Sequence, residues 1–391
     1  MSSVLPPLPP KPGSPGRSSQ PLAPAAKASA QASSASRALA TQTRSSTKAV
    51  LTLLLSLLLL SGCYYAHLAR GQARLLLARR DIDAVLSDPA TAPEIRSALL
   101  RVKAVRAYAR ELGLDVGGQY TSYAEWPGNR VVTTVVITAP GEIEPTPFGF
   151  PLVGEVPYKG YFDVGAAERE AERLRGAGYD VCLVPVPAYS TLGWFDDPVT
   201  TPLLQGDPGD LVETLLHELV HATVFVRSDA DFNEGLATFY AQEATLRFFA
   251  EQELAALPRE RERIRERRDV AALLAELRQA VAELYASESP VDADSREALS
   301  QSARATLASL PLKRNDPEAL AATIPLGDAC LALVGTYTAD LPAYEGRLQA
   351  LDGDLGAFLD QAKQAAEASD PRASLLAPQE SAPVRDSLPA P

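Results

Sequence analysis

The sequence predicts an α+β fold, because segments with the composition of strands precede a well-capped amphipathic helix, and helical segments fill most of the remaining chain. Three valine-rich segments bounded by Pro and Gly are the predicted strands: Arg130–Ala139, Phe150–Tyr158 and Tyr179–Tyr189. A helix-like stretch, Gly165–Gly176, lies between two of them. We therefore expect a mixed sheet with a helix packed on one face, and we expect Tyr179–Tyr189 to be an edge strand.

The most clearly marked helix of the sequence begins near Pro208. Asp207 is a suitable N-cap, Pro208 takes the first helical position, and Asp210 adds an acidic residue to the first turn. The apolar residues that follow recur at helical spacing: Leu211, Val212, Leu215, Leu216, Leu219 and Val220. This apolar stripe predicts a buried helix that packs on one face of the sheet.

Further helices are predicted on both sides of these elements. Glu94–Leu112 precedes the strands, while Ala241–Tyr285 and residues 296–309 and 340–368 follow the central helix. Within the first of the later helices, Arg259–Arg268 is dense in charges of both signs. Mixed charges of this kind predict a solvated helix face.

The two ends of the chain differ in composition from its middle. Residues 1–48 are rich in Ser, Ala, Pro and Gln and hold no aromatic residue, so we expect a disordered leader. Residues 368–391 return to Ser, Pro and Ala, which predicts a disordered tail. Residues 64–367 are long enough for one catalytic domain with a buried core and a helical C-terminal part.

An apolar run near the N-terminus predicts membrane attachment. Residues 49–63 join the hydrophobic segment Ala49–Leu60 to preceding basic residues, as in a secretion signal. Leu60-Ser61-Gly62-Cys63 resembles a lipobox, in which Cys63 becomes the lipidated N-terminus. The alternative is an uncleaved anchor, because Ala49–Ala69 is close to the roughly twenty residues that span a bilayer. Both interpretations place the folded domain in the cell envelope, facing the periplasm or the exterior.

Charge and cysteine content exclude some classes of protein. Residues 1–62 carry +6, which leaves −18 for the rest of a chain whose net charge is −12. Such an acidic domain is repelled by phosphate backbones, so we expect no nucleic-acid partner. Beyond Cys63 the cysteines are Cys182 and Cys330, so at most one disulfide can form and the fold cannot depend on a cysteine framework.

A histidine pair in the central helix predicts a metal site. His217 and His221 stand four residues apart, with Glu218 between them. Positions i and i+4 share a helix face, so both imidazoles can point at one ion while Glu218 lies beside them. The pattern is that of a zinc peptidase with the glutamate as general base. The third histidine, His67, follows the apolar run, so we expect the remaining ligand to be a carboxylate.

Glu234 is the best candidate for that third ligand. It belongs to Asn233-Glu234-Gly235-Leu236-Ala237, which follows twelve residues after the second histidine. The polar stretch 227–231 predicts a turn, with Asp229 or Asp231 as the N-cap of a second helix that starts near Asn233 and holds Glu234 in its first turn. A short reversal between two packed helices would bring this carboxylate opposite the imidazoles. Three other acids remain weaker alternatives: Asp229, Asp231 and Glu243.

The two motifs together resemble those of the gluzincins, zinc peptidases that take a glutamate from a second helix as the third ligand. This resemblance implies a zincin-like mixed sheet with an active-site helix. It also implies His217, His221 and Glu234 as zinc ligands. Glu218 would then be the general base. The linker of twelve residues is shorter than in thermolysin-like or leukotriene-hydrolase-like members.

Other segments resemble the bacterial family of predicted aminopeptidase lipoproteins over residues 60–370. They are Cys63–Tyr65, Ile82–Leu86, Tyr120–Tyr123, Gly160–Phe162, Pro187–Pro198, Gly335–Tyr337 and Leu341–Tyr344. The resemblance implies a membrane-anchored zinc aminopeptidase that acts on peptides. Resemblance and position also indicate Tyr189 or Tyr337 as the donor to the oxyanion. In zinc peptidases an edge strand commonly pairs with the substrate, which would give the segment around Tyr189 a role in recognition.

The chemistry implied by this site is hydrolysis of a peptide bond. Zinc lowers the pKa of its bound water and polarises the scissile carbonyl, while Glu218 takes the proton and hands it to the leaving amine. An exopeptidase also needs a carboxylate that grips the free amine, and no Gly-x-Met-Glu-Asn motif is recognisable. Two alternatives therefore remain beside the aminopeptidase: a zinc endopeptidase of the envelope, and a catalytically silent lipoprotein for binding or scaffolding.

Overall fold

The computed structural model describes residues 64–150, 154–188, 196–227, 229–287, 292–338 and 340–376. The chain divides into two compact units, Leu8–Leu77 and a unit that contains Ala78–Pro391. In the first unit residues 64–77 are helical, and the expected leader and signal segment, residues 1–63, lie outside the described residues. Of the described helices, none is both long enough and apolar enough to cross a membrane.

The second unit combines short strands with many helices, which confirms the predicted α+β class. The strands are β1 (Arg79–Asp81), β2 (Ser122–Ala124), β3 (Val132–Thr138), β4 (Phe148–Phe150), β5 (Gly154–Val156), β6 (Tyr158–Tyr161), β7 (Asp180–Val186) and β8 (Val199–Thr200). The helices are α2 (Ile82–Ser87), α3 (Pro93–Glu111), α4 (Val164–Gly176), α5 (Thr201–Leu204), α6 (Pro208–Thr223), α7 (Ala230–Gln252), η1 (Leu254–Ala256), α8 (Leu257–Ser287), α9 (Ala293–Ala308), α10 (Pro317–Thr323), α11 (Asp328–Thr338), α12 (Leu341–Ala350), α13 (Leu355–Ala366) and α14 (Pro371–Leu376).

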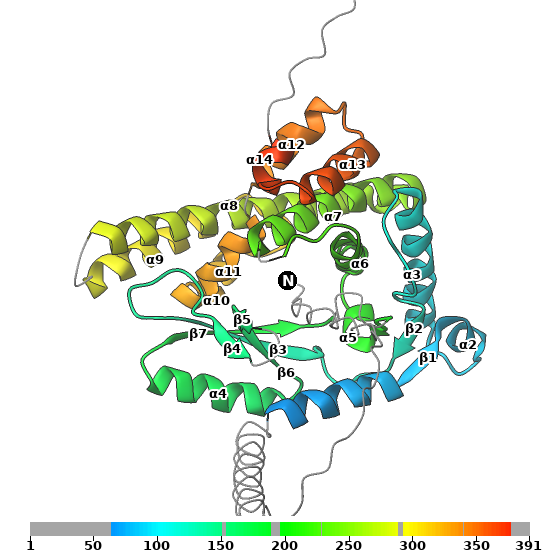
Figure 1. Cartoon of the computed structure of the whole chain (residues 1–391), viewed down its shortest axis with the longest axis horizontal. Coiled ribbons are helices and arrows are strands. Elements are labelled where there is room, and N and C mark those ends of the chain that lie inside the picture. Colours follow the sequence, from blue (N-terminus) through cyan, green and yellow to red (C-terminus); the bar gives the residue numbers. More distant parts are fainter. Residues whose placement is uncertain are drawn as a thin grey trace, which may run out of the picture. The chain divides into compact units, whose positions relative to one another are not determined.

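An antiparallel sheet in the order β6-β3-β7 contains two of the predicted strands, Arg130–Ala139 as β3 and Tyr179–Tyr189 as β7. All seven residues of β3 are buried, because α4 and α11 cover the sheet from opposite sides (Figure 1). Val136 packs with Leu333 of α11, on the same face as the cysteine of β7. Among the described strands β7 pairs only with β3, so the prediction of an edge strand is confirmed. The predicted strand Phe150–Tyr158 is instead divided between the hairpin β4–β5 and the start of β6.

A second sheet, β1-β2-β8, is mixed and leads into the central helices. β1 is antiparallel to β2, whereas β2 is parallel to β8. The chain continues from β8 directly into α5 and then α6. The Tyr123 hydroxyl of β2 lies 2.8 Å from the Thr201 hydroxyl, and this contact joins the sheet to the first residue of α5.

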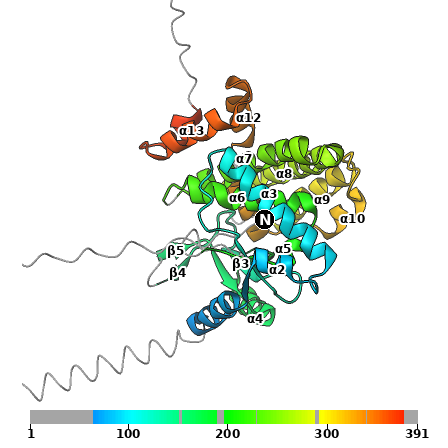
Figure 2. The same cartoon turned by 90° about the vertical axis from the view of Figure 1, so that its right-hand side faces the viewer.

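Helix α6 packs against other helices, so the prediction that it covers the sheet was wrong. Its neighbours are α7 and α3, and α7 in turn packs beside α8 (Figures 1 and 2). Ten of its sixteen residues are buried, including residues outside the predicted apolar stripe. A helix that is covered on several sides needs helical neighbours rather than one sheet face. The helix that does pack on the sheet is α11.

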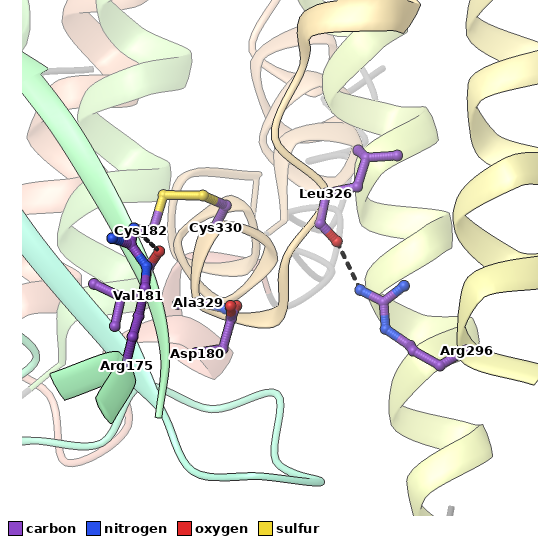
Figure 3. Close-up of a disulfide and its surroundings, with 8 residues drawn as sticks. All are labelled: Arg175, Asp180, Val181, Cys182, Arg296, Leu326, Ala329 and Cys330. Carbon is purple, nitrogen blue, oxygen red and sulfur yellow. Dashed lines mark hydrogen bonds between the residues drawn. A yellow bond between two sulfur atoms is a disulfide. The ribbon is translucent and has the colours of Figure 1, made fainter. Parts of the chain in front are cut away.

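A disulfide joins the edge strand to that helix. Cys182 of β7 and Cys330 of α11 are bonded, and they are 148 residues apart in sequence (Figure 3). Beside the disulfide, the Asp180 carboxylate accepts a hydrogen bond of 2.8 Å from the backbone N–H of Ala329. The single disulfide that the cysteine count permits therefore forms, and it fixes the start of α11 against the sheet.

The C-terminal helices extend the main core past the predicted domain end. Tyr344 of α12 and Phe358 of α13 pack against Phe239 of α7. Leu375 of α14 is also a buried member of this core. The predicted disordered tail therefore begins too early at residue 368, because residues 371–376 form a helix; residues 377–391 lie outside the described residues.

The charged stretch of α8 is another correction to the sequence analysis. Glu260, Arg263 and Glu266 are 2–5% exposed, although the mixed charges predict a solvated face. Arg263 reaches across to α6, and Glu266 accepts hydrogen bonds from the loop at residues 313–315. The charges are buried because each has a partner: Arg263 and Glu266 contact distant parts of the chain, and Glu260 accepts a hydrogen bond from Arg263 at 2.6 Å.

Candidate metal centre

Helix α6 holds both histidines in place through its ends as well as its apolar faces. The Asp207 side chain caps the N-terminus by accepting a hydrogen bond of 2.9 Å from the Gly209 N–H, and Pro208 follows it in the first turn. At the other end, Thr223 accepts a hydrogen bond of 2.8 Å from the backbone N–H of Asp115. These contacts confirm the predicted start of the helix.

The turn between α6 and α7 is fastened by Asn233. Its side-chain oxygen accepts a hydrogen bond from the Val226 N–H at 2.8 Å, and its amide donates to the Val226 carbonyl at 2.7 Å. Asp229 caps α7 by accepting from the Phe232 N–H at 3.0 Å. The helix begins at Ala230, earlier than predicted, so Glu234 lies in the second turn rather than the first. The asparagine of the second motif thus has a structural role.

His217, His221 and Glu234 converge and could hold a metal ion. The two Nε2 atoms are 3.0 Å apart, and Glu234 Oε2 lies 3.1 Å from His217 Nε2 and 3.5 Å from His221 Nε2. Ligand bonds of 2.0–2.2 Å in a tetrahedral zinc site place neighbouring ligand atoms about 3.3 Å apart. The observed triangle has this size, so the residues fit the ion that the sequence predicts.

The three side chains are buried and electrostatically coupled. His217 and His221 are 6% and 5% exposed, and the Glu234 side chain is 12% exposed. Burial by itself would raise the pKa of Glu234, but His221 and His217 outweigh it and lower that pKa to about 2. Burial likewise would lower the pKa of His221, whereas the charge of Glu234 and its hydrogen bond raise it. The carboxylate is therefore ionised, as a metal ligand must be.

Glu218 lies beside the triad and does not belong to it. Its side chain is buried, with 5% exposed, on the same helix as the histidines. Its negative charge contributes to the raised pKa of His221, which places it in the surroundings of the ligands. A carboxylate in this position can exchange a proton with a molecule held at the metal.

Tyr337 of α11 is the candidate oxyanion donor that the structure brings to the triad. Its ring stacks on that of His217, with centroids 6.3 Å apart and an interplanar angle of 26°. Burial raises the pKa of Tyr337 well above its ordinary value, and the charge of Glu234 and a hydrogen bond with it raise it further. The hydroxyl is therefore protonated at neutral pH.

The weaker carboxylate alternatives are not brought to the triad. Asp229 caps α7, Asp231 is exposed, and Glu243 pairs with Arg268 at 2.8 Å. Two other predicted functional residues, Tyr189 and Cys63, lie outside the described residues. Their roles in substrate recognition and lipidation stay predictions.

Comparison with known proteins places the chain in a family. A model of the family described as "Putative aminopeptidase" matches residues 63–375. The chain belongs to this family. Membership supports a peptidase activity at a general level and bears out the aminopeptidase part of the resemblance drawn from the sequence. No curated protein and no solved structure matches the chain.

The centre of this aminopeptidase-family member includes a residue that sequence reasoning did not assign. Tyr120 is 4% exposed and has a left-handed backbone with φ of 57°, which is unusual for a residue other than glycine. Burial raises the pKa of its hydroxyl well above its ordinary value, and the charges of Glu218 and Asp197 add to the effect. The strained backbone thus places a protonated tyrosine near the candidate base. The family resemblance included Tyr120–Tyr123, but nothing in the residue pattern of this turn indicated a position near Glu218.

A cavity of about 740 Å³ adjoins the triad at His217 and Tyr337. Its walls come from α6, α7 and α8, together with the end of α11 and the segment after β7. Several of its lining residues are charged or amide side chains: Asp210, Glu213, Gln242, Arg267 and Arg268. No pattern in the sequence indicated this cavity, since its lining is assembled from segments as far apart as Asn129 and Leu341.

Proposed function

We propose that this protein is a membrane-anchored zinc aminopeptidase, which hydrolyses the first peptide bond of peptides with a free N-terminus. The observation that carries the proposal is the triangle of His217, His221 and Glu234, with ligand atoms 3.0–3.5 Å apart. A set of two histidines and a glutamate is a common ligand set of catalytic zinc in peptidases. Family membership supports the same conclusion.

The positions of the side chains indicate the role of each residue in the proposed reaction. Zinc, when bound, supplies a water of lowered pKa and polarises the scissile carbonyl. Glu218 takes the proton of the attacking water and delivers it to the leaving amine. The hydroxyl of Tyr337, which stays protonated, donates to the developing oxyanion. The low exposure of Glu218 keeps these proton transfers away from bulk solvent.

The proposed location is the cell envelope. The disulfide between Cys182 and Cys330 supports it, because disulfides persist in oxidising compartments and are rare in the cytosol. Metabolic labelling with a lipid precursor tests the anchor: we expect label on the wild type and none on Cys63→Ser. Recovery of the unlabelled protein in the cytosolic fraction would contradict both forms of the anchor.

A peptide panel tests the activity. The full chain in detergent, loaded with zinc, is incubated with matched peptides that carry either a free or an acetylated N-terminus, and the products are identified by mass spectrometry. We expect removal of single N-terminal residues from the free peptides only, with loss of activity after chelation and recovery after zinc is restored. Internal cleavage of the acetylated peptides would establish the endopeptidase alternative. Stoichiometric zinc without any cleavage would establish the silent lipoprotein.

A further inference from the structure

Two arginines line the cavity beside the triad. It begins at His217 and Tyr337 and is bordered along its length by Thr214 of α6 and Thr238 of α7. Arg267 and Arg268 line it from α8. Helix α7 packs against both α6 and α8 (Figures 1 and 2), and all three helices contribute residues to the lining of this one cavity.

The length of this space follows from helix geometry. Seven residues separate His217 from Asp210, the cavity residue nearest the start of α6, and a rise of 1.5 Å per residue gives roughly 10 Å. Eight residues separate Glu234 from Gln242 on α7, which gives roughly 12 Å. An extended peptide spans about 3.3–3.6 Å per residue, so the arginines lie about three residues from the reacting carbonyl.

Arg268 is held in a fixed orientation. Its Nε donates to Gln242 Oε1 at 2.7 Å and its Nη2 to Glu243 Oε1 at 2.8 Å. The guanidinium also lies over the ring of Phe239, 5.9 Å from the centroid. Within the described chain, Nη1 of this residue has no hydrogen-bond partner, and Glu243 does not line the cavity. Arg268 therefore presents a guanidinium of fixed orientation at the cavity wall, and its Nη1 can donate to a ligand.

The two acids of the cavity are already shared between arginines. Asp210 accepts from Arg263 and Arg267, both at 2.7 Å. Glu213 accepts from the same pair at 2.7 and 3.1 Å. A cationic ligand at either acid would meet two guanidinium groups at close range. Glu243, the acid that pairs with Arg268, does not line the cavity, so an anionic ligand can approach the remaining Nη1 donor of this arginine. This arrangement favours a carboxylate over an amine beside Arg268.

We propose that Arg268, assisted by Arg267, binds a carboxylate of the substrate about three residues from the scissile bond, so that the enzyme selects peptides that carry a carboxylate at this distance. This inference rests on the proposed peptidase function. Two groups have the required chemistry, namely the C-terminal carboxylate of a short peptide and an acidic side chain at the same distance. Arginine recognises both through the same forked geometry.

Calorimetric titration of the zinc-loaded Glu218→Gln full chain separates these sources without turnover. The ligands are tetra-alanine with a free C-terminus, its C-terminal amide, and an amide whose fourth residue is glutamate. We expect the free acid or the glutamyl amide to bind about tenfold more tightly than the alanyl amide. Whichever of the two binds tightly identifies the source. Equal binding of all three, or tighter binding of a peptide with lysine at the fourth position, would overturn the proposal.

Variants in the same background assign the effect. Arg268→Ala should abolish the preference for the carboxylate. Arg268→Lys should reduce it, because lysine keeps the positive charge but cannot form two parallel hydrogen bonds with a carboxylate. Arg261→Ala is the matched control: it removes the same charge from an exposed position of α8 that does not line the cavity. If Arg268→Ala unfolds, the more exposed Arg267→Ala gives a second test. An unchanged preference in folded Arg267→Ala and Arg268→Lys would contradict the assignment.

The same experiment keeps the two proposals apart. A preference for the carboxylate in a protein that cleaves no peptide would leave the arginine site standing and refute the peptidase function. Cleavage of peptides by the wild type without any preference for a carboxylate would support the peptidase function and refute the arginine site.

Discussion

Two clusters of buried charged side chains lie at opposite ends of α6, and they differ in the cation that balances their carboxylates. Towards its C-terminal end, His217, His221 and Glu234 converge, and their ligand atoms lie 3.0–3.5 Å apart. Towards its N-terminal end, Arg263 of α8 is 5% exposed and reaches Glu260 at 2.6 Å and both Asp210 and Glu213 at 2.7 Å. The cluster at the N-terminal end contains its own cation, Arg263. The cluster of His217, His221 and Glu234 is instead a set of ligands suited to a metal cation.

The difference shows why burial of charge by itself is weak evidence of a functional site. Burial would lower the pKa of Arg263, but Glu213 and Glu260 outweigh it and raise that pKa. The arginine therefore stays charged and the network is satisfied by the chain alone. In the triad, the Nε2 atoms of two imidazoles and a carboxylate oxygen face one another, and no guanidinium joins them in the described interactions. One cluster contributes to stability, and the other is suited to catalysis.

Glu218→Gln should have the largest effect, and it tests the catalytic role of the cluster around the metal ligands. This substitution removes a proton acceptor beside the triad and leaves the three ligands in place. We expect turnover to fall by about 10²–10⁴-fold, the usual contribution of a general base, while zinc remains bound. Steady-state kinetics together with metal content check it, and turnover at the wild-type rate would remove Glu218 from the mechanism.

Arg263→Ala breaks the other cluster. It leaves Glu260, Glu213 and Asp210 without their buried cation, and we expect the free energy of unfolding to fall by about 3–5 kcal/mol. Denaturant titration measures this loss. In the fraction that remains folded, metal content should stay at the wild-type level, since no ligand of the triad contacts Arg263. Loss of metal without loss of stability would contradict the separation of the two clusters.

Gly209→Ala tests how closely α8 approaches the N-terminus of α6. A Cβ at this position would overlap with Glu260 Oε2 and lie 2.6 Å from Arg263 Nε. We expect a loss of about 1–3 kcal/mol, because both side chains must move from a satisfied network. Gly346→Ala in α12 is the matched control, since a Cβ there meets nothing within 4 Å. It should increase stability by up to about 1 kcal/mol.

Glu170 of α4 gives the smallest effect and a pH signature. The hydrogen bond from Arg173 leads the causes that lower its pKa from 4.5 to about 2, with Lys159 of β6 adding to it against the opposing effect of burial. A lowered pKa in the folded state gives stability that is present above pH 4.5 and is lost as the pH falls towards 2.

We therefore expect Glu170→Gln to cost about 0.5–1 kcal/mol at pH 7, a value discounted for solvent screening, and less at pH 3. Chemical denaturation at the two pH values measures the difference. Glu168→Gln, at an exposed neighbouring position, is the control and should change little at either pH. A cost at pH 3 that equals or exceeds the cost at pH 7 would contradict the assignment.

Local signals in the sequence were enough to predict the triad. The N-cap Asp207, the spacing of the two histidines and the cap Asp229 are all set within a few residues of the helices they define. The position of Glu234 opposite the histidines needed only a short turn between two helices. These features depend on backbone geometry over one or two turns, so the sequence contains them.

Features that depend on distant segments could not be predicted in this way. Arg263 is buried because Asp210 and Glu213, fifty or more residues earlier, face it. The cover of the sheet by α11, and with it the position of Tyr337, depends on packing across the disulfide of Cys182. The charge pattern of α8 alone is equally compatible with solvent, so its burial emerges only from the tertiary fold.

The central claim is that the cluster on α6 and α7 binds one zinc ion through His217, His221 and Glu234. The most direct test is the metal content of the purified chain by mass spectrometry, for the wild type, His217→Ala, Glu234→Ala and Glu243→Ala. The account predicts one zinc per chain in the wild type and in Glu243→Ala, whose carboxylate pairs with Arg268, and none in the two triad variants. Zinc retained after loss of either triad residue, or no zinc in the reconstituted wild type, would contradict it.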